Sequence, residues 1–158
     1  MDKAADILVV DDQEQVIFHL HTVLSEQGYK VRTAKDGHQA LAMMRRQKPD
    51  LVISDFRMPG LDGFEMLRLL QGDAQLGDIP VIVITGKPLD ASTRSMVEME
   101  PNVKKLFPKP VDVVGLLKAV REALGGGSGA VSSTPADDFQ SYFPNMQRDP
   151  KNPEPPKD

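Results

Sequence analysis

The stretch that decides the fold reads LVISDFRMPGLDG and covers residues 51–63. It opens with an aliphatic run, which is typical of a β-strand covered on both faces in a parallel sheet. The run ends abruptly on a carboxylate, Asp55, and a turn containing Pro59 and Gly60 follows. In open parallel sheets, ligands bind beyond the carboxyl ends of the strands. Asp55 is therefore the first candidate for a functional side chain.

Similar runs on either side of this stretch predict a sheet. We expect strands at residues 7–10, 30–34, 51–54, 81–85 and 105–107. Helical patterns alternate with them at residues 14–27, 37–47, 63–71, 91–99 and 112–124. Five strand–helix units in succession predict an α/β fold with a parallel sheet. Prolines flank the fourth helix, so we expect it to be short.

The composition of the chain changes at Gly125. We assign residues 1–124 to one domain, residues 125–136 to a Gly/Ser-rich linker and residues 137–158 to a flexible Pro-rich tail. The run GGGSG is typical of flexible spacers, whether native or engineered. The tail carries the segment DDFQSYFP, in which acidic residues precede three aromatic ones. This segment is either a short docking motif or an ordinary tail.

Composition excludes several classes of function. The 158-residue chain has no cysteine and a net charge of −4, and it has no apolar run near the roughly 20 residues of a membrane helix. It lacks a basic stripe, which argues against a nucleic-acid partner. Its first residues do not read as a secretory signal. We expect a cytoplasmic protein that binds neither membrane nor nucleic acid.

Polar residues follow four of the five predicted strands. Asp11 and Asp12 follow the first, Asp55 the third, Thr85 the fourth and, after a short gap, Lys109 the fifth. We expect them to meet at one edge of the sheet. Three carboxylates repel one another and require a cation, and oxygen ligands suit Mg²⁺. Beside a metal, Asp55 can act as a nucleophile toward phosphorus, with Lys109 neutralising the phosphate and Thr85 donating a hydrogen bond.

Taken alone, each of these residues has an ordinary structural explanation. An acid at the end of a strand is most often a helix cap or a solvated turn residue, and Asp12 could simply start the first helix. A threonine that ends a strand is usually structural, and Lys-Pro is common in loops. Their joint occurrence, in order and on the appropriate strands, is much harder to obtain by chance and favours a functional site.

The pattern resembles the receiver domain of two-component response regulators over about residues 5–124. The motifs that carry the resemblance are LVVDD at 8–12, SDFRMPGLDG at 54–63, VITG at 83–86 and PKP at 108–110. The resemblance implies a flavodoxin-like (βα)5 doubly wound parallel sheet with strand order 2-1-3-4-5. It also implies a phosphorylation-dependent switch in a phosphorelay, with no catalysis beyond its own phosphotransfer and autodephosphorylation.

The resemblance also assigns roles at the predicted acidic edge. Asp55 would accept a phosphoryl group from a histidine kinase or a phosphotransfer protein. Asp12 and Asp55 would ligate Mg²⁺ directly, together with the backbone carbonyl of Arg57, whereas Asp11 would act largely through water. Thr85 would move toward the phosphoryl oxygens.

The end of the fifth predicted strand both follows and departs from the family pattern. Lys109 would pair with the phosphoryl group, and the Lys109–Pro110 peptide would be cis. The family usually has an aromatic residue at the position of Leu106, where it rotates inward as the threonine moves. Phe107 is adjacent, but neighbours in a strand face opposite sides of the sheet, so it cannot simply replace that aromatic. Coupling from Thr85 to the surface is therefore in doubt.

Downstream partners in this family commonly bind the face formed by the fourth helix, the fifth strand and the fifth helix. Lys104, Lys105 and Lys118 lie in or near these elements and could attract the acidic end of the tail motif, in cis or in trans. One alternative is an interaction module on the same fold that works without phosphorylation, which Leu106 favours mildly. Another is a hydrolase with an aspartyl-phosphate intermediate, which requires a second acid two residues after the nucleophile. Arg57 occupies that position and argues against a hydrolase.

Overall fold

The computed structural model describes residues 4–58, 60–61 and 63–125. The linker and tail assigned from the sequence lie beyond this part of the chain, apart from Gly125, so their boundaries stay predictions. None of the helices in the described ranges has the length and apolar character needed to cross a membrane.

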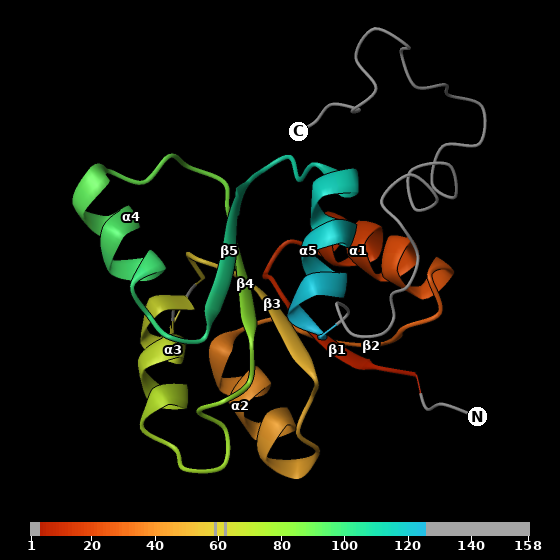
Figure 1. Cartoon of the computed structure of the whole chain (residues 1–158), viewed down its shortest axis with the longest axis horizontal. Helices are drawn as coiled ribbons and strands as arrows, with labels where there is room; N and C mark the ends of the chain where they lie inside the picture. The colour runs from red at the N-terminus through yellow and green to blue at the C-terminus, as the bar shows by residue number, and fades with distance from the viewer. Residues whose placement is uncertain (1–3, 59, 62, 126–158) are drawn as a thin grey trace, which may run out of the picture. The chain divides into compact units, whose positions relative to one another are not determined.

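Strands and helices alternate throughout the described chain (Figure 1). The strands are β1 (Asp6–Val10), β2 (Lys30–Ala34), β3 (Leu51–Asp55), β4 (Val81–Thr85) and β5 (Val103–Pro108). The helices are α1 (Glu14–Glu26), α2 (Gly37–Arg46), α3 (Gly63–Gln71), α4 (Ala91–Glu98) and α5 (Val113–Ala123). All strand pairs are parallel and the order across the sheet is β2-β1-β3-β4-β5. This confirms the flavodoxin-like fold expected from the sequence.

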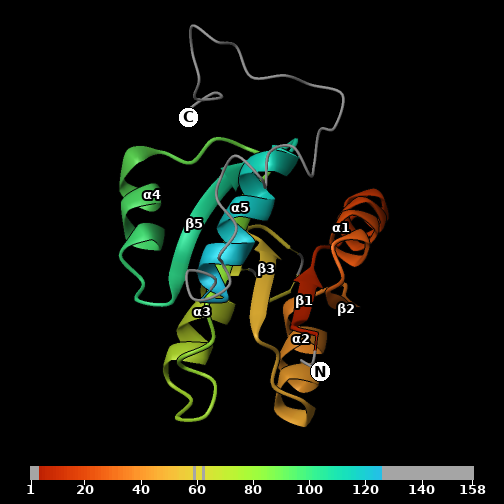
Figure 2. The ribbon, with the colours of Figure 1, turned by 45° about the vertical axis from the view of Figure 1, so that its right-hand side comes forward.

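Helices cover both faces of the sheet. One face carries α2, α3 and α4, and the other carries α1 and α5 (Figures 1 and 2). Every residue of β1, β3 and β4 is buried, which explains why these strands read as nearly continuous aliphatic runs. Alternate residues of each strand serve opposite faces, so that Leu8 and Val10 join the cluster under α2 and α3.

The ends of the helices follow local signals in the sequence. The Asp90 side chain accepts a hydrogen bond from the Thr93 backbone N–H at 2.8 Å and caps α4, which is only eight residues long, as expected. Asp112 is the N-cap residue of α5, but its side chain makes no capping bond. Gly125 follows α5 with φ +79°, a conformation that glycine adopts without the steric cost of a Cβ atom.

The outer strand β5 is longer than the sequence predicted. The aliphatic pattern indicated residues 105–107, whereas the strand runs from Val103 to Pro108. Lys104 is exposed at this edge of the sheet, so it gives no apolar signal that would extend the predicted strand back to Val103. Lysines on an outer strand are typical, because they discourage pairing with another sheet.

Close backbone packing holds the end of β3 against the start of α3. The Phe56 N–H donates to the Ile84 carbonyl and the Gly63 N–H donates to the Phe56 carbonyl, both at 2.8 Å. A Cβ atom at Gly63 would collide with the Asp55 carbonyl oxygen and would stand 2.9 Å from the Cα of Phe56. Glycine at position 63 therefore lets the helix approach the strand that carries Asp55.

We predict that Gly63→Ala lowers the free energy of unfolding by about 1–3 kcal/mol, because the new methyl group meets backbone atoms that cannot move aside easily. Gly72→Ala is the matched control. A Cβ at Gly72 meets its nearest atom at 3.7 Å, an ordinary contact. Its effect should stay within about 0.5 kcal/mol. Urea denaturation followed by circular dichroism measures both, and equal costs at the two positions would contradict the packing argument.

Candidate functional site

The three aspartates predicted from the sequence meet at the carboxyl end of the sheet. Asp11 and Asp12 directly follow β1, and Asp55 is the last residue of β3, which is hydrogen-bonded to β1. One carboxylate oxygen from each of the three lies within 4.8 Å of the other two. Asp11 is 0% exposed and Asp55 is 4% exposed, whereas Asp12 is exposed to solvent. The cluster thus has two buried members and one open side.

Lys109 reaches into this cluster from the other side. Its Nζ lies 2.9 Å from Asp11 Oδ2 and 3.4 Å from Asp55 Oδ2. The backbone N–H of Lys109 donates to the Thr85 carbonyl at 2.8 Å, which fixes the residue next to the end of β4. The Lys109–Pro110 peptide is cis, as expected. The structure therefore brings Lys109 into contact with two of the three acids, Asp11 and Asp55.

The electrostatic balance of the cluster is unfavourable. Burial, together with the nearby charge of Asp11, raises the pKa of Asp55 from 3.8 to about 6. Lys109 opposes this shift through its charge and a hydrogen bond, as does the Arg57 backbone N–H, but these contributions are smaller. One ammonium group does not compensate three neighbouring carboxylates.

The residues present fit a divalent cation. Asp11 Oδ2 is buried and accepts no hydrogen bond from the described residues, although the Lys109 ammonium stands 2.9 Å away. Asp11 Oδ1 already accepts the Gln13 backbone N–H at 2.8 Å. Carboxylate oxygens with one side open to water are the ligands that Mg²⁺ prefers. An ion here would supply the positive charge that the cluster lacks.

Arg57 stands two residues beyond Asp55. Its side chain is exposed, and its guanidinium carbon lies 5.5 Å from the centre of the Phe56 ring. Its backbone N–H donates to the Asp55 carboxylate. The role expected for its carbonyl group, as a ligand of the metal, stays a prediction.

Thr85 ends β4 beside the cluster, but its hydroxyl points elsewhere. Thr85 Oγ1 donates to the Lys87 carbonyl at 2.8 Å, within the loop that leads to α4. Leu106 is 8% exposed and belongs to the apolar cluster that includes Val97 of α4. Phe107 lies on the opposite side, where its ring is 3.3 Å from the position of a Cβ atom at Gly115. Leu106 and Phe107 thus face opposite sides, as strand alternation predicts.

Sequence reasoning missed one member of the site. The Gln13 side chain accepts a hydrogen bond from Lys109 Nζ at 3.0 Å. The available signal was indirect: glutamine stands at the start of a predicted helix, where Ser, Thr, Asp or Asn is favoured as the cap. No spacing pattern connects two residues that lie 96 positions apart.

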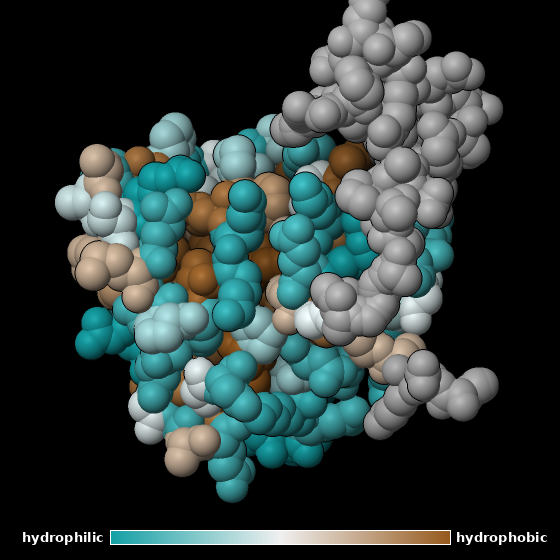
Figure 3. Space-filling model, viewed as in Figure 1, coloured by the Kyte–Doolittle hydropathy of each residue, from teal (hydrophilic) through white to brown (hydrophobic). Residues whose placement is uncertain are grey.

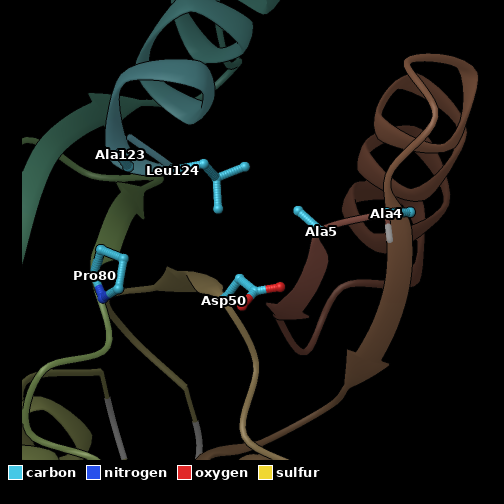
Figure 4. Close-up of a pocket in the computed structure, with 6 residues that line it drawn as sticks. All are labelled: Ala4, Ala5, Asp50, Pro80, Ala123 and Leu124. Carbon is cyan, nitrogen blue, oxygen red and sulfur yellow. The ribbon is translucent and has the colours of Figure 1, made fainter. Parts of the chain in front are cut away.

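A hollow of about 480 Å³ lies near the amino ends of the strands (Figure 4). It is lined by Ala4, Ala5, Asp50, Pro80, Ala123 and Leu124. Its one charged side chain is Asp50, whose Oδ2 already accepts the Asp6 backbone N–H at 2.8 Å. It gathers no convergent polar groups, and so the acidic edge is the stronger candidate site.

Comparisons with known proteins identify the family to which the chain is similar. The model of the response regulator receiver domain matches residues 7–121. Protein PilH of Pseudomonas aeruginosa is 38% identical over 122 residues, which cover 77% of this chain and 99% of PilH. Response regulator PleD of Caulobacter vibrioides is 41% identical over 118 residues, 75% of this chain, but the match spans only 26% of PleD.

Solved structures show the same likeness. The signal receiver domain of a signal transduction histidine kinase from Syntrophus aciditrophicus superposes with a TM-score of 0.71 at 34% identity, covering 84% of this chain and 99% of that chain. The chemotaxis response regulator CheY4 of Vibrio cholerae gives a TM-score of 0.69 at 27% identity, with 77% and 99% covered.

The raised pKa of Asp55 predicts a pH-dependent effect of Asp55→Asn without divalent cations. The carboxyl group ionises near pH 3.8 in the unfolded chain and near 6 in the folded one, so its ionisation weakens the fold as pH rises through about 6. At about pH 8 the neutral amide should therefore stabilise the protein, by at most about 3 kcal/mol for a shift of this size. At about pH 4 the gain should vanish.

Urea denaturation at the two pH values measures this difference. Asp78→Asn, at an exposed aspartate paired with Lys48 at 2.8 Å, should give no gain and serves as the control. An Asp55→Asn variant that is no more stable than the wild type at about pH 8 would contradict the electrostatic account.

Proposed function

This chain belongs to the response regulator receiver domain family, and we propose that Asp55 is the residue through which it receives its signal. The family acts in phosphorylation-dependent signalling. The observation that carries the proposal is the position of the Asp55 carboxylate, which lies in a cluster with Asp11 and Asp12 and 3.4 Å from the Lys109 ammonium. The donor would be a phosphohistidine of a histidine kinase or a phosphotransfer protein.

The transfer is a displacement at phosphorus. An Asp55 carboxylate oxygen attacks, the phosphorus–nitrogen bond breaks, and the imidazole leaves with its electron pair and takes up a proton from solvent. An acyl phosphate forms on Asp55. Lys109 is close enough to pair with the new phosphoryl charge. Attack of water at phosphorus later releases phosphate and restores the carboxylate, so the chain acts only on itself.

The metal expected from the sequence fits this proposal. Asp11, Asp12 and Asp55 would hold Mg²⁺, with the Arg57 carbonyl as a further ligand. The bound ion would supply positive charge that offsets both the carboxylates and the incoming phosphoryl group. Asp12 is open to solvent, which suits a direct ligand. Asp11 already uses one oxygen on the Gln13 backbone N–H, which suits a contact through water.

Thr85 would transmit the phosphorylation of Asp55 to the loop before α4. To reach the phosphoryl group, its hydroxyl must break its hydrogen bond to the carbonyl of Lys87, which lies in that loop. Leu106 favours a second candidate function. It is a buried aliphatic residue where the family usually has an aromatic one, and it offers no ring to follow the threonine. A module that binds its partner without phosphorylation is therefore the alternative.

The output surface that we propose consists of α4, β5 and α5. Met96 and Met99 are 50% and 78% exposed on and just after α4. Lys104 and Lys105 on β5 and Lys118 on α5 are exposed as well. Figure 3 shows apolar surface between hydrophilic side chains over this part of the molecule. Apolar surface between positively charged side chains suits an acidic partner with apolar side chains, such as the motif at residues 137–144 of the same chain or of a second copy.

Removal of the tail tests this surface. We expect amide resonances of residues 90–124 to differ between the full chain and a 1–124 truncation, because tethering raises the local concentration of the motif. Addition of Mg²⁺ and beryllofluoride, a phosphoryl analogue, should shift the same resonances. Spectra that agree over residues 90–124 with and without the tail would rule out docking. Resonances that do not shift when the analogue is added would favour the alternative function, a module that binds its partner without phosphorylation.

Treatment with acetyl phosphate and Mg²⁺ tests the acceptor. We expect one phosphoryl group, which mass spectrometry maps to Asp55, and no label in Asp55→Asn. Asp78→Asn is the matched control and should be labelled like the wild type, because Asp78 lies on the surface away from the site. Chelation of Mg²⁺ should slow labelling at least about tenfold. Label that persists in Asp55→Asn would refute the assignment.

A further inference from the structure

Lys109 has one neutral partner that the proposed function does not use. Its ammonium group lies 2.9 Å from Asp11 Oδ2 and 3.4 Å from Asp55 Oδ2, both ion-pair distances. It donates a hydrogen bond to Gln13 Oε1 at 3.0 Å. The Lys109 side chain is only 14% exposed, whereas the Gln13 end of the contact is open to solvent. Gln13 is therefore placed to decide where the ammonium points.

The start of α1 leaves the Gln13 side chain free for this contact. Gln13 is the N-cap of the helix, with an extended backbone, yet its side chain makes no capping bond. The helix start is held through the backbone instead, since the Gln13 N–H donates to Asp11 Oδ1 at 2.8 Å. Its carbonyl accepts the N–H groups of Val16 and Ile17, each at 3.1 Å. A departure from the preferred cap residues without a local gain is typical of a functional position.

The other two acceptors change during the proposed reaction, whereas Gln13 does not. Asp55 becomes an acyl phosphate, a mixed anhydride of its carboxyl group and phosphoric acid, and a cation competes with Lys109 for Asp11. The carboxamide of Gln13 is neutral and takes no part in the bond changes. It is the one partner that can hold the ammonium in the same place before and after transfer.

We propose that Gln13 is a positioning residue for phosphoryl transfer, whose Oε1 holds the Lys109 ammonium beside Asp55. The inference rests on the proposed role of Asp55 as the acceptor. Because Gln13 is itself exposed, the contact has a moderate effect on the rate rather than an absolute one. Loss of the acceptor leaves the ammonium to turn toward Asp11 or solvent.

Three substitutions separate this role from a structural one. Gln13→Met keeps the length of the side chain and removes its acceptor oxygen, Gln13→Asn keeps the amide but is one methylene shorter, and Gln13→Glu keeps both an acceptor and the reach. The experiment uses the full chain with acetyl phosphate and saturating Mg²⁺. We expect Gln13→Met and Gln13→Asn to slow the labelling of Asp55 about 3- to 10-fold. The labelling rate of Gln13→Glu should stay within about twofold of that of the wild type.

A purely structural role predicts another order. Asparagine is a better N-cap residue than glutamine. If Gln13 only started the helix, the Gln13→Asn variant would therefore be labelled at Asp55 at the wild-type rate or faster. Two further measurements report on Lys109. The Met variant should keep the Mg²⁺ affinity of the wild type, because Gln13 contacts the lysine through its side chain and not the metal. In a Lys109→Met background, Gln13→Met should slow labelling no further.

The outcomes are distinct. If the wild type takes label at Asp55 but the Met and Asn variants match it, or if Gln13→Met slows labelling equally in the Lys109→Met background, the positioning role is wrong and the proposed function stands. If the wild type takes no label at Asp55, the proposed function fails, and the inference falls with it.

Discussion

The rest of the structure depends on an excess of negative charge at one edge of the sheet. Asp11 and Asp55 are buried side by side and share one ammonium group, at 2.9 and 3.4 Å. The result is a carboxyl group on Asp55 with a pKa of about 6. Such a site is costly for the isolated chain. Binding of a cation together with a phosphoryl group, as we propose, would offset that cost.

The topology of the sheet creates this excess. In the order β2-β1-β3-β4-β5, the first and third strands are neighbours, so Asp11 and Asp55 end adjacent strands. Neighbouring strands lie about 5 Å apart, and an intervening strand would have doubled that separation. Lys109 arrives from the far side through its backbone bond to Thr85 on β4. Gly63 lets α3 approach the same strand end without moving Asp55.

Much of this arrangement could be predicted from the sequence. The central strands are buried on both faces, so each is a nearly continuous aliphatic run, and polar residues stand where these runs end. The outer strand β5 was predicted too short, since Lys104 faces solvent and carries no apolar signal that would extend the strand back to Val103. The meeting of the aspartates with Lys109 followed from the parallel topology. The Gln13 contact and the direction of the Thr85 hydroxyl did not, because each depends on a rotamer chosen among three-dimensional neighbours rather than on spacing along the chain.

If the excess of charge is the central property of the site, a cation must stabilise the folded chain through the aspartates. The most direct measurement is the urea midpoint of the wild type with and without saturating Mg²⁺, at about pH 8, beside the same pair for Asp55→Asn. A ligand that binds only the folded state raises its stability. The account predicts a clear rise for the wild type and a much smaller one for the variant. The account would be contradicted if the urea midpoint of the wild type did not change with Mg²⁺, or if Mg²⁺ raised the midpoint of both proteins equally.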